Sequence, residues 1–134
     1  MEFRILGPVE AVADGEAVEL GGGKLRTLLG LLCLDANRVV STERLIDALW
    51  GESPPETATN NLQVYVSQLR RALREAEPGS ERLLVTRRPG YVLRVESSAL
   101  DVARFERGVA EGRAALAAGN PEAGLTLLRE ALGL

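Results

Sequence analysis

The sequence predicts an α+β protein in which three helices lie between two β-hairpins, followed by a helical hairpin. Three observations predict this order. Short β-rich runs with turn signals occur at residues 1–20 and 83–95. Between them, leucines recur at a spacing of three and four, which is typical of helices with one buried face. After residue 96 the composition becomes rich in alanine, leucine, glutamate and arginine.

The overall composition is that of a folded protein, with 134 residues, 46% hydrophobic and 26% charged. No apolar stretch approaches the ~20 residues that cross a bilayer, and the N-terminus lacks a secretory signal pattern. A single cysteine excludes an internal disulfide and indicates an intracellular protein. Because histidine is absent, His-based triads and His metal sites are excluded. We therefore expect no enzyme, no membrane association, no metal and no cofactor.

The first twenty residues predict a β-hairpin. Its turn is Asp14-Gly15, a strong hairpin dipeptide, and apolar residues precede and follow it. On the return strand Val18 and Leu20 alternate with a glutamate, which is typical of a strand with one buried face.

Three glycines and a lysine over residues 21–24 allow two interpretations. A phosphate-binding loop is disfavoured because Val18 stands where that loop requires glycine, and Leu25 where it requires serine or threonine. The better interpretation is a connector that leads into a helix over 24–34, whose leucines share one face.

Two more helices are predicted before the second hairpin. Ser41 has the side chain of an N-cap, and Gly51 ends the helix that it begins. The segment 53–56, Ser-Pro-Pro-Glu, fits a capping box with proline at the first helical position. It predicts a helix over 54–76 that stops before a Pro-Gly pair.

Residues 97–134 are expected to form a second domain, distinct from a first domain over 1–96. A helix is predicted over 101–118, and Gly119-Asn120-Pro121 ends it and begins another, with Asn120 as N-cap. Because the chain stops inside this helical array, we expect it to be a fragment with an incomplete second domain.

Arginine is concentrated in one part of the chain. The whole sequence carries 16 basic and 19 acidic residues, a net charge of −3. Residues 62–95, however, carry seven arginines and three glutamates, a local net charge of +4. A basic island in an acidic chain indicates one surface that faces a polyanion.

The helix predicted over 54–76 has a polar side opposite its apolar side. Amide, hydroxyl, small apolar and guanidinium groups share it, and such groups read base edges in the major groove. Arg70 and Arg74 flank this side, where we expect them to reach phosphates. A solvated face with incidental arginines is the alternative interpretation. With the hairpin, the candidate DNA-binding residues are Asn60, Asn61, Val64, Ser67, Gln68, Arg70, Arg71, Arg74, Arg87 and Arg88.

The tip of the second hairpin favours the DNA interpretation. Pro89-Gly90 preorganises a turn that carries Arg87 and Arg88, and arginine on a narrow extension suits the minor groove or a phosphate. Surface turns usually place acids beside such arginines, but the nearest preceding acid is Glu81. A long helix with a polar side, followed by an arginine-tipped hairpin, is the winged-helix arrangement.

Several motifs together resemble a known family. The segment 61–73, NLQVYVSQLRRAL, the Pro89-Gly90-Tyr91 turn and Gly7-Pro8 in the first strand are similar to the Streptomyces antibiotic regulatory protein family. The resemblance covers residues 1–96 as an OmpR-type winged-helix DNA-binding domain. Residues 97–134 look like the start of the bacterial transcriptional activator domain, which is a tetratricopeptide-like helical array.

This resemblance implies a sequence-specific activator of transcription that binds double-stranded DNA and regulates a secondary-metabolite or related gene cluster. Helix 54–76 would lie in the major groove, and the Arg87-Arg88 tip in the minor groove. Homodimers or tandem protomers would bind direct repeats about one DNA turn apart. The loop where relatives contact RNA polymerase, often its sigma factor, corresponds to Gly51, Glu52, Ser53, Pro54 and Pro55. The expected location is the bacterial cytoplasm, at the nucleoid.

Two other classes of function are alternatives. A protein-interaction module would bind its partner through the helical hairpin at 97–134, with the first domain only as a scaffold. A small hydrolase or nucleotide-binding enzyme is disfavoured by the missing histidines and the failed phosphate loop. Because no receiver domain precedes Met1, phosphorelay control within this chain is not expected.

Overall fold

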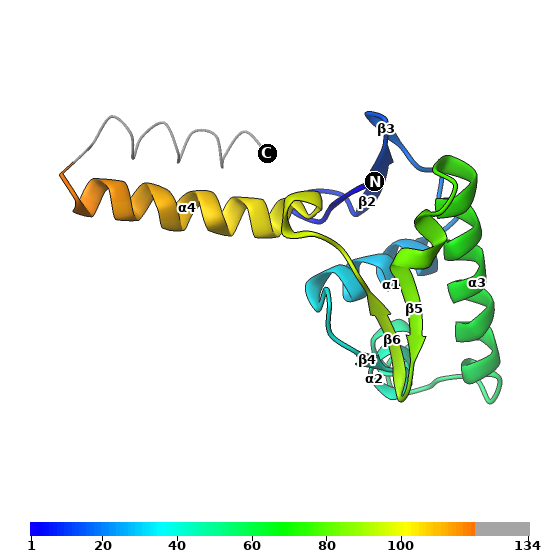
Figure 1. The fold of residues 1–134 in the computed structure, drawn as a ribbon. Coiled ribbons are helices and arrows are strands. Elements are labelled where there is room, and N and C mark those ends of the chain that lie inside the picture. The colour runs from blue at the N-terminus through cyan, green and yellow to red at the C-terminus, as the bar shows by residue number, and fades with distance from the viewer. Residues whose placement is uncertain (120–134) are drawn as a thin grey trace. The chain divides into compact units, whose positions relative to one another are not determined.

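The computed structural model describes residues 1–119 of a chain that divides into two compact units, Met1–Val95 and a second that begins at Glu96. The first unit contains three α-helices and two small antiparallel sheets (Figure 1). This arrangement confirms the predicted α+β class.

The N-terminal sheet is a meander of β1 (Glu2–Arg4), β2 (Glu10–Ala13) and β3 (Glu16–Ala17). Asp14 and Gly15 both have positive φ in the turn between β2 and β3, as predicted for this hairpin dipeptide. The return strand is shorter than predicted, because the chain leaves the sheet after Val18 and buries Leu20 on its way to the next helix.

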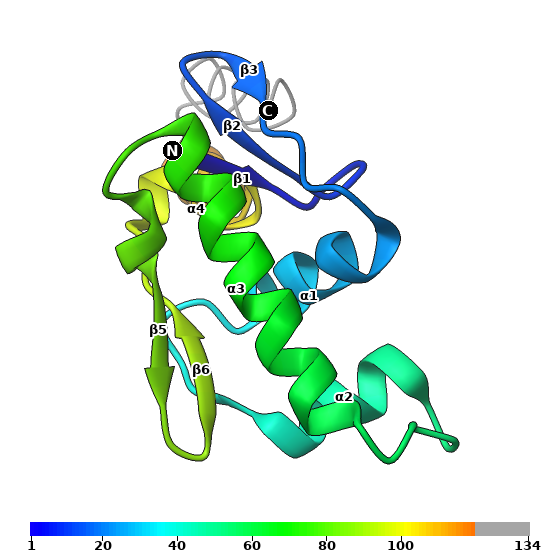
Figure 2. The same cartoon turned by 90° about the vertical axis from the view of Figure 1, so that its right-hand side faces the viewer.

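The core of the first unit lies between α1 (Gly23–Leu34), α3 (Ala58–Ala76) and the sheets. In Figure 2, α3 crosses the unit, with the second hairpin along one side and α1 behind it. Full burial of a leucine contributes about 2 kcal/mol. The core side chains with no exposed surface include Phe3, Leu28, Leu29, Leu32, Leu62, Leu69, Leu73 and Leu93.

The predicted limits of α2 (Thr42–Trp50) are confirmed. The Ser41 side-chain oxygen accepts a hydrogen bond from the backbone N–H of Arg44 at 3.1 Å, which is the geometry of an N-cap. Gly51 follows the last residue with a φ of 69°, a conformation that glycine adopts without a steric penalty.

The predicted start of the next helix was wrong. α3 begins at Ala58 instead of residue 54, and Thr57, not Ser53, is its N-cap residue. The reason is local, because a proline disfavours helical backbone in the residue before it, so Pro55 keeps Pro54 out of a helix. Residues 51–57 form an exposed loop instead of a first helical turn.

The second sheet has the strand order β4-β6-β5. Its hairpin consists of β5 (Leu84–Arg87) and β6 (Gly90–Leu93). The β-rich pattern predicts strands over 83–86 and 91–95, so the observed bounds differ by one or two residues. Leu83 belongs to a short 3-10 turn, Ser80–Leu83. The third strand, β4 (Val40–Ser41), was not predicted, since two residues leave no alternating pattern.

The second unit contains a short 3-10 turn, Ser97–Ala99, and α4 (Asp101–Ala117). The predicted helix over 101–118 is thereby confirmed to within one residue. The predicted second helix, with Asn120 as its N-cap, lies outside the described residues. Among the helices described, none has both the length and the apolar character that a membrane span requires.

Candidate nucleic-acid interface

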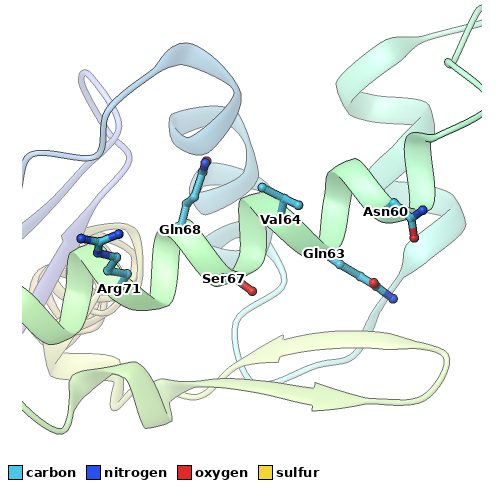
Figure 3. Close-up of a pocket in the computed structure, with 6 residues that line it drawn as sticks. All are labelled: Asn60, Gln63, Val64, Ser67, Gln68 and Arg71. Atoms are coloured by element: carbon cyan, nitrogen blue, oxygen red, sulfur yellow. The ribbon is translucent and has the colours of Figure 1, made fainter.

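One side of α3 carries exposed polar side chains around an open surface hollow of about 500 Å³. Figure 3 shows these side chains spaced along the helix, with the β5–β6 hairpin running beside it. Val64 is the one aliphatic member, and 51% of its surface is exposed. An apolar group of this size suits a thymine methyl. The lining residues are Asn60, Gln63, Val64, Ser67, Gln68 and Arg71.

The apolar side of α3 determines the direction in which its polar side faces. Leu62, Val66, Leu69 and Leu73 recur at a spacing of four and three, and each is at most 1% exposed. Burying that stripe turns the polar residues outward, so five of the predicted contact residues do line one surface. Gln63 was missed, although its spacing of three residues from Asn60 and four from Ser67 places its amide on the same side of the helix, where the same major-groove logic applies.

Three other predicted contact residues lie away from the hollow. Asn61 is half-buried, and its Nδ2 donates a hydrogen bond to Thr57 Oγ1 at 3.2 Å. Arg70 is half-buried and directs its guanidinium to β5. Arg74 is exposed in the last turn of α3.

Arg71 lines the hollow while paired with a neighbour on its own helix. Its Nε donates to Glu75 Oε1 at 3.0 Å, and both side chains are mostly exposed. Exposed pairs of this kind contribute about 0.3–0.5 kcal/mol. Glu75 therefore positions the Arg71 side chain, yet breaking this ion pair so that Arg71 can bind another anion costs little free energy.

The β5–β6 hairpin turns through a two-residue loop, Arg88 and Pro89, because Arg87 pairs with Gly90 across the strands. The loop itself is held from outside the hairpin, since the backbone N–H of Thr42 donates to the Pro89 carbonyl oxygen at 3.0 Å. The arginine-bearing turn is thus tied to the first turn of α2 as well as to its own strands.

A second hollow of about 240 Å³ opens beside this hairpin. Its five lining residues include two arginines and no acid, so its electrostatic potential favours anions. Arg94 was not among the predicted contacts. The signal for it was its place among the seven arginines of residues 62–95, directly after β6. The lining residues are Asn37, Val39, Arg87, Val92 and Arg94.

The α2–α3 loop begins at Gly51 beside a stack of three side chains from three helices. Trp50 and Tyr65 stack with ring centroids 6.0 Å apart and an interplanar angle of 22°. The Nζ of Lys24 lies 5.2 Å from the centroid of Trp50 and donates a hydrogen bond to the carbonyl oxygen of Leu49. Lys24, at the start of α1, therefore caps the C-terminal end of α2, where the helix dipole favours a cation.

Replacing Lys24 with methionine is expected to lower the free energy of unfolding by about 1–2 kcal/mol, because a charge-assisted hydrogen bond and a cation–π contact are lost. Trp50 is the only tryptophan, so its fluorescence reports the change directly. We expect a shifted emission maximum and stronger acrylamide quenching. Arg26→Met, at an exposed position of α1, is the control, and equal effects of the two substitutions would refute a specific role for Lys24.

Two family models match the chain. The model described as "Transcriptional regulatory protein, C terminal" matches residues 15–93, and the model described as "Bacterial transcriptional activator domain" matches residues 100–134. The two matched ranges fall in the two compact units.

Curated relatives match the whole chain. Regulatory protein AfsR of Streptomyces griseus is 37% identical over 134 residues, which are 100% of this chain and 13% of that protein. Transcriptional regulator RedD of Streptomyces coelicolor is 35% identical over an alignment of 136 positions, which covers 100% of this chain and 39% of that protein. The chain thus spans well under half the length of these relatives, of which AfsR is a regulatory protein and RedD a transcriptional regulator by name.

A solved structure also matches. Mycobacterium tuberculosis EmbR, in complex with a low affinity phosphopeptide, superposes with a TM-score of 0.93 at 37% sequence identity. The match covers 98% of this chain and 35% of the EmbR chain.

Proposed function

We propose that this chain, which belongs to the Streptomyces antibiotic regulatory protein family, is the DNA-binding part of a transcriptional activator of a secondary-metabolite or related gene cluster. One observation carries the proposal. Exposed amide, hydroxyl and guanidinium groups line one side of α3 directly beside an arginine-bearing hairpin. We assign residues 1–96 to the DNA-binding domain and residues 97–134 to the start of the activator domain.

In the proposed complex, α3 lies in the major groove. Amide side chains pair with adenine, arginine pairs with guanine, and Val64 contacts a thymine methyl. The exposed residues around the larger hollow supply these groups, with Arg71 as the guanine contact. Asn61 and Arg74, which lie outside the hollow, belong to the flanks of this surface and are suited to phosphates.

The hairpin supplies the second part of the proposed interface. Arg87 and Arg88 are exposed at its end and suit a narrow minor groove, where the negative potential is enhanced. Arg94 shares a hollow with Arg87, and we add it as a contact to the adjacent phosphates. Contacts to the DNA phosphates would supply most of the binding affinity. Contacts of α3 to the base edges would determine which DNA sequence is bound.

The α2–α3 loop is the proposed contact for RNA polymerase or its sigma factor. Residues 51–55 are all exposed, and the loop is anchored at its start by the stacked Trp50 and Tyr65. A loop with one rigid end presents its backbone and side chains in a limited set of positions, which favours recognition by a second protein.

Paired or tandem protomers on direct repeats complete the proposal, with recognition helices about one helical turn apart. Binding to the chromosome would place the protein at the nucleoid in the bacterial cytoplasm.

Affinity selection of the chain against sheared DNA of its source genome, followed by sequencing, tests the proposed function. We expect enrichment of a short motif repeated head-to-tail at about one DNA turn. If each protomer neutralises about 4–6 phosphates, a plot of the logarithm of the DNA-binding constant against the logarithm of the salt concentration has a slope of roughly −4 to −5. Enrichment without a motif would leave only phosphate binding, and no enrichment at any salt concentration would favour the protein-interaction module.

A further inference from the structure

Arg70 connects the two elements that the proposed function places on DNA. Its Nε donates to the carbonyl oxygen of Leu84 at 2.9 Å, and its Nη2 donates to Thr86 Oγ1 at 2.8 Å. Both acceptors belong to β5, and Arg70 belongs to α3. A single guanidinium thus joins the helix to the strand that ends in Arg87.

The alternation of side chains along β5 explains why Arg70 reaches the side chain of Thr86 and not that of Arg87. Leu84 is buried in the core, and Thr86, two residues later, stands on the same side of the sheet. Arg87 stands on the opposite side, where it lines the smaller hollow. Arg70 therefore holds the residue directly before Arg87 while leaving Arg87 itself exposed.

We propose that Arg70 is a positioning residue, which holds the arginine-bearing hairpin at a set distance and angle from α3 so that both reach one DNA duplex. A guanidinium suits this role because its donors are arranged in a rigid planar fork. A hairpin held in its bound position loses less entropy on binding. This inference rests on the proposed function and replaces the phosphate contact that the sequence suggested for Arg70.

A double-mutant cycle between Arg70 and Arg87 tests the inference on the whole chain. The probe is a duplex that carries the motif enriched in the selection. Arg70→Gln alone is expected to weaken binding about tenfold, a coupling of the size seen between interacting residues. In the Arg87→Ala background the same substitution is expected to change affinity by less than about twofold, because the contact of Arg87, the residue next to the Thr86 that Arg70 holds, is already lost.

A direct phosphate contact by Arg70 would give a different result. Arg70→Gln would then weaken binding equally in both backgrounds, and it would reduce the salt slope by about 1 in each. Such additivity overturns the inference. Arg74→Gln is the matched control on the same helix, since Arg74 is exposed and we expect it to behave additively with Arg87→Ala.

Two conservative variants distinguish the geometry of the Arg70 hydrogen bonds from its positive charge, and a binding effect from a folding defect. Arg70→Lys keeps the charge but not the fork, and it is expected to bind as weakly as Arg70→Gln; affinity equal to the original chain would overturn the inference. Thr86→Val removes only one acceptor and is expected to weaken binding about threefold, again only when Arg87 is present. If Arg70→Gln fails to fold, the Thr86–Arg87 cycle decides the question.

The outcomes for the two proposals are distinguishable. A folded chain that enriches no DNA overturns the proposed function, and the inference with it. A chain that binds its motif but shows additive effects of Arg70→Gln and Arg87→Ala overturns only the positioning role.

Discussion

Replacing Arg71 and Arg87 together with alanine is expected to weaken binding to the selected DNA by about 30- to 10⁴-fold. The two arginines stand on different elements, and each is exposed on a surface proposed to face DNA. A well-placed arginine contact is worth about 1–3 kcal/mol, and 1.4 kcal/mol corresponds to a factor of ten. The sum of two such losses gives the expected range.

The measurement is titration of a labelled duplex by the original and variant chains at fixed salt. Arg26→Ala with Arg82→Ala is the control, because it removes the same charge from exposed arginines that line neither hollow. We expect this control to lose much less affinity, with both variants folded by circular dichroism. A folded Arg71→Ala/Arg87→Ala chain that binds as tightly as the original would refute the proposed interface.

Replacing Gly90 with alanine is expected to lower the free energy of unfolding by about 3 kcal/mol, at the upper end of the usual cost of overpacking. A Cβ atom at this position would lie 1.9 Å from the carbonyl oxygen of Val40 and 2.8 Å from the Cα of Ser41. Both are backbone atoms, so no side-chain rotation relieves the clash. β4 must move away from β6, and the pairing of Ser41 with Gly90 is lost.

Urea denaturation followed by the fluorescence of Trp50 measures this effect. Gly7→Ala is the matched control, since nothing lies within 4 Å of the added Cβ and the φ of Gly7 is not positive. We expect the control to change stability by less than about 0.5 kcal/mol. If Gly90→Ala lowered the free energy of unfolding by less than about 1 kcal/mol, β4 could move away from β6 at little cost, and the close approach of the two strands would not be a strong constraint.

The sequence was sufficient for features that depend on periodicity or on one residue's conformation. The spacing of Leu62, Val66, Leu69 and Leu73 settled which side of α3 is exposed, because only one rotation of the helix buries all four. The Ser41 cap and the Asp14-Gly15 turn followed from local chemistry. The start of α3 is equally local, because Pro55 disfavours helical backbone at Pro54 and so opposes the start that the capping-box pattern predicts.

Other features were decided by the tertiary structure alone. The second sheet partner of β6, besides β5, is a two-residue strand about fifty positions earlier, and the requirement for Gly90 exists only because that backbone passes so close. The acceptors of Arg70 and Lys24 lie 14 to 25 residues away and include backbone carbonyls, which any residue type supplies. A sequence pattern records which residues face inward, since burial selects the side chain. It does not record which distant backbone atom an exposed charge will meet, because that depends on how the helices and strands pack.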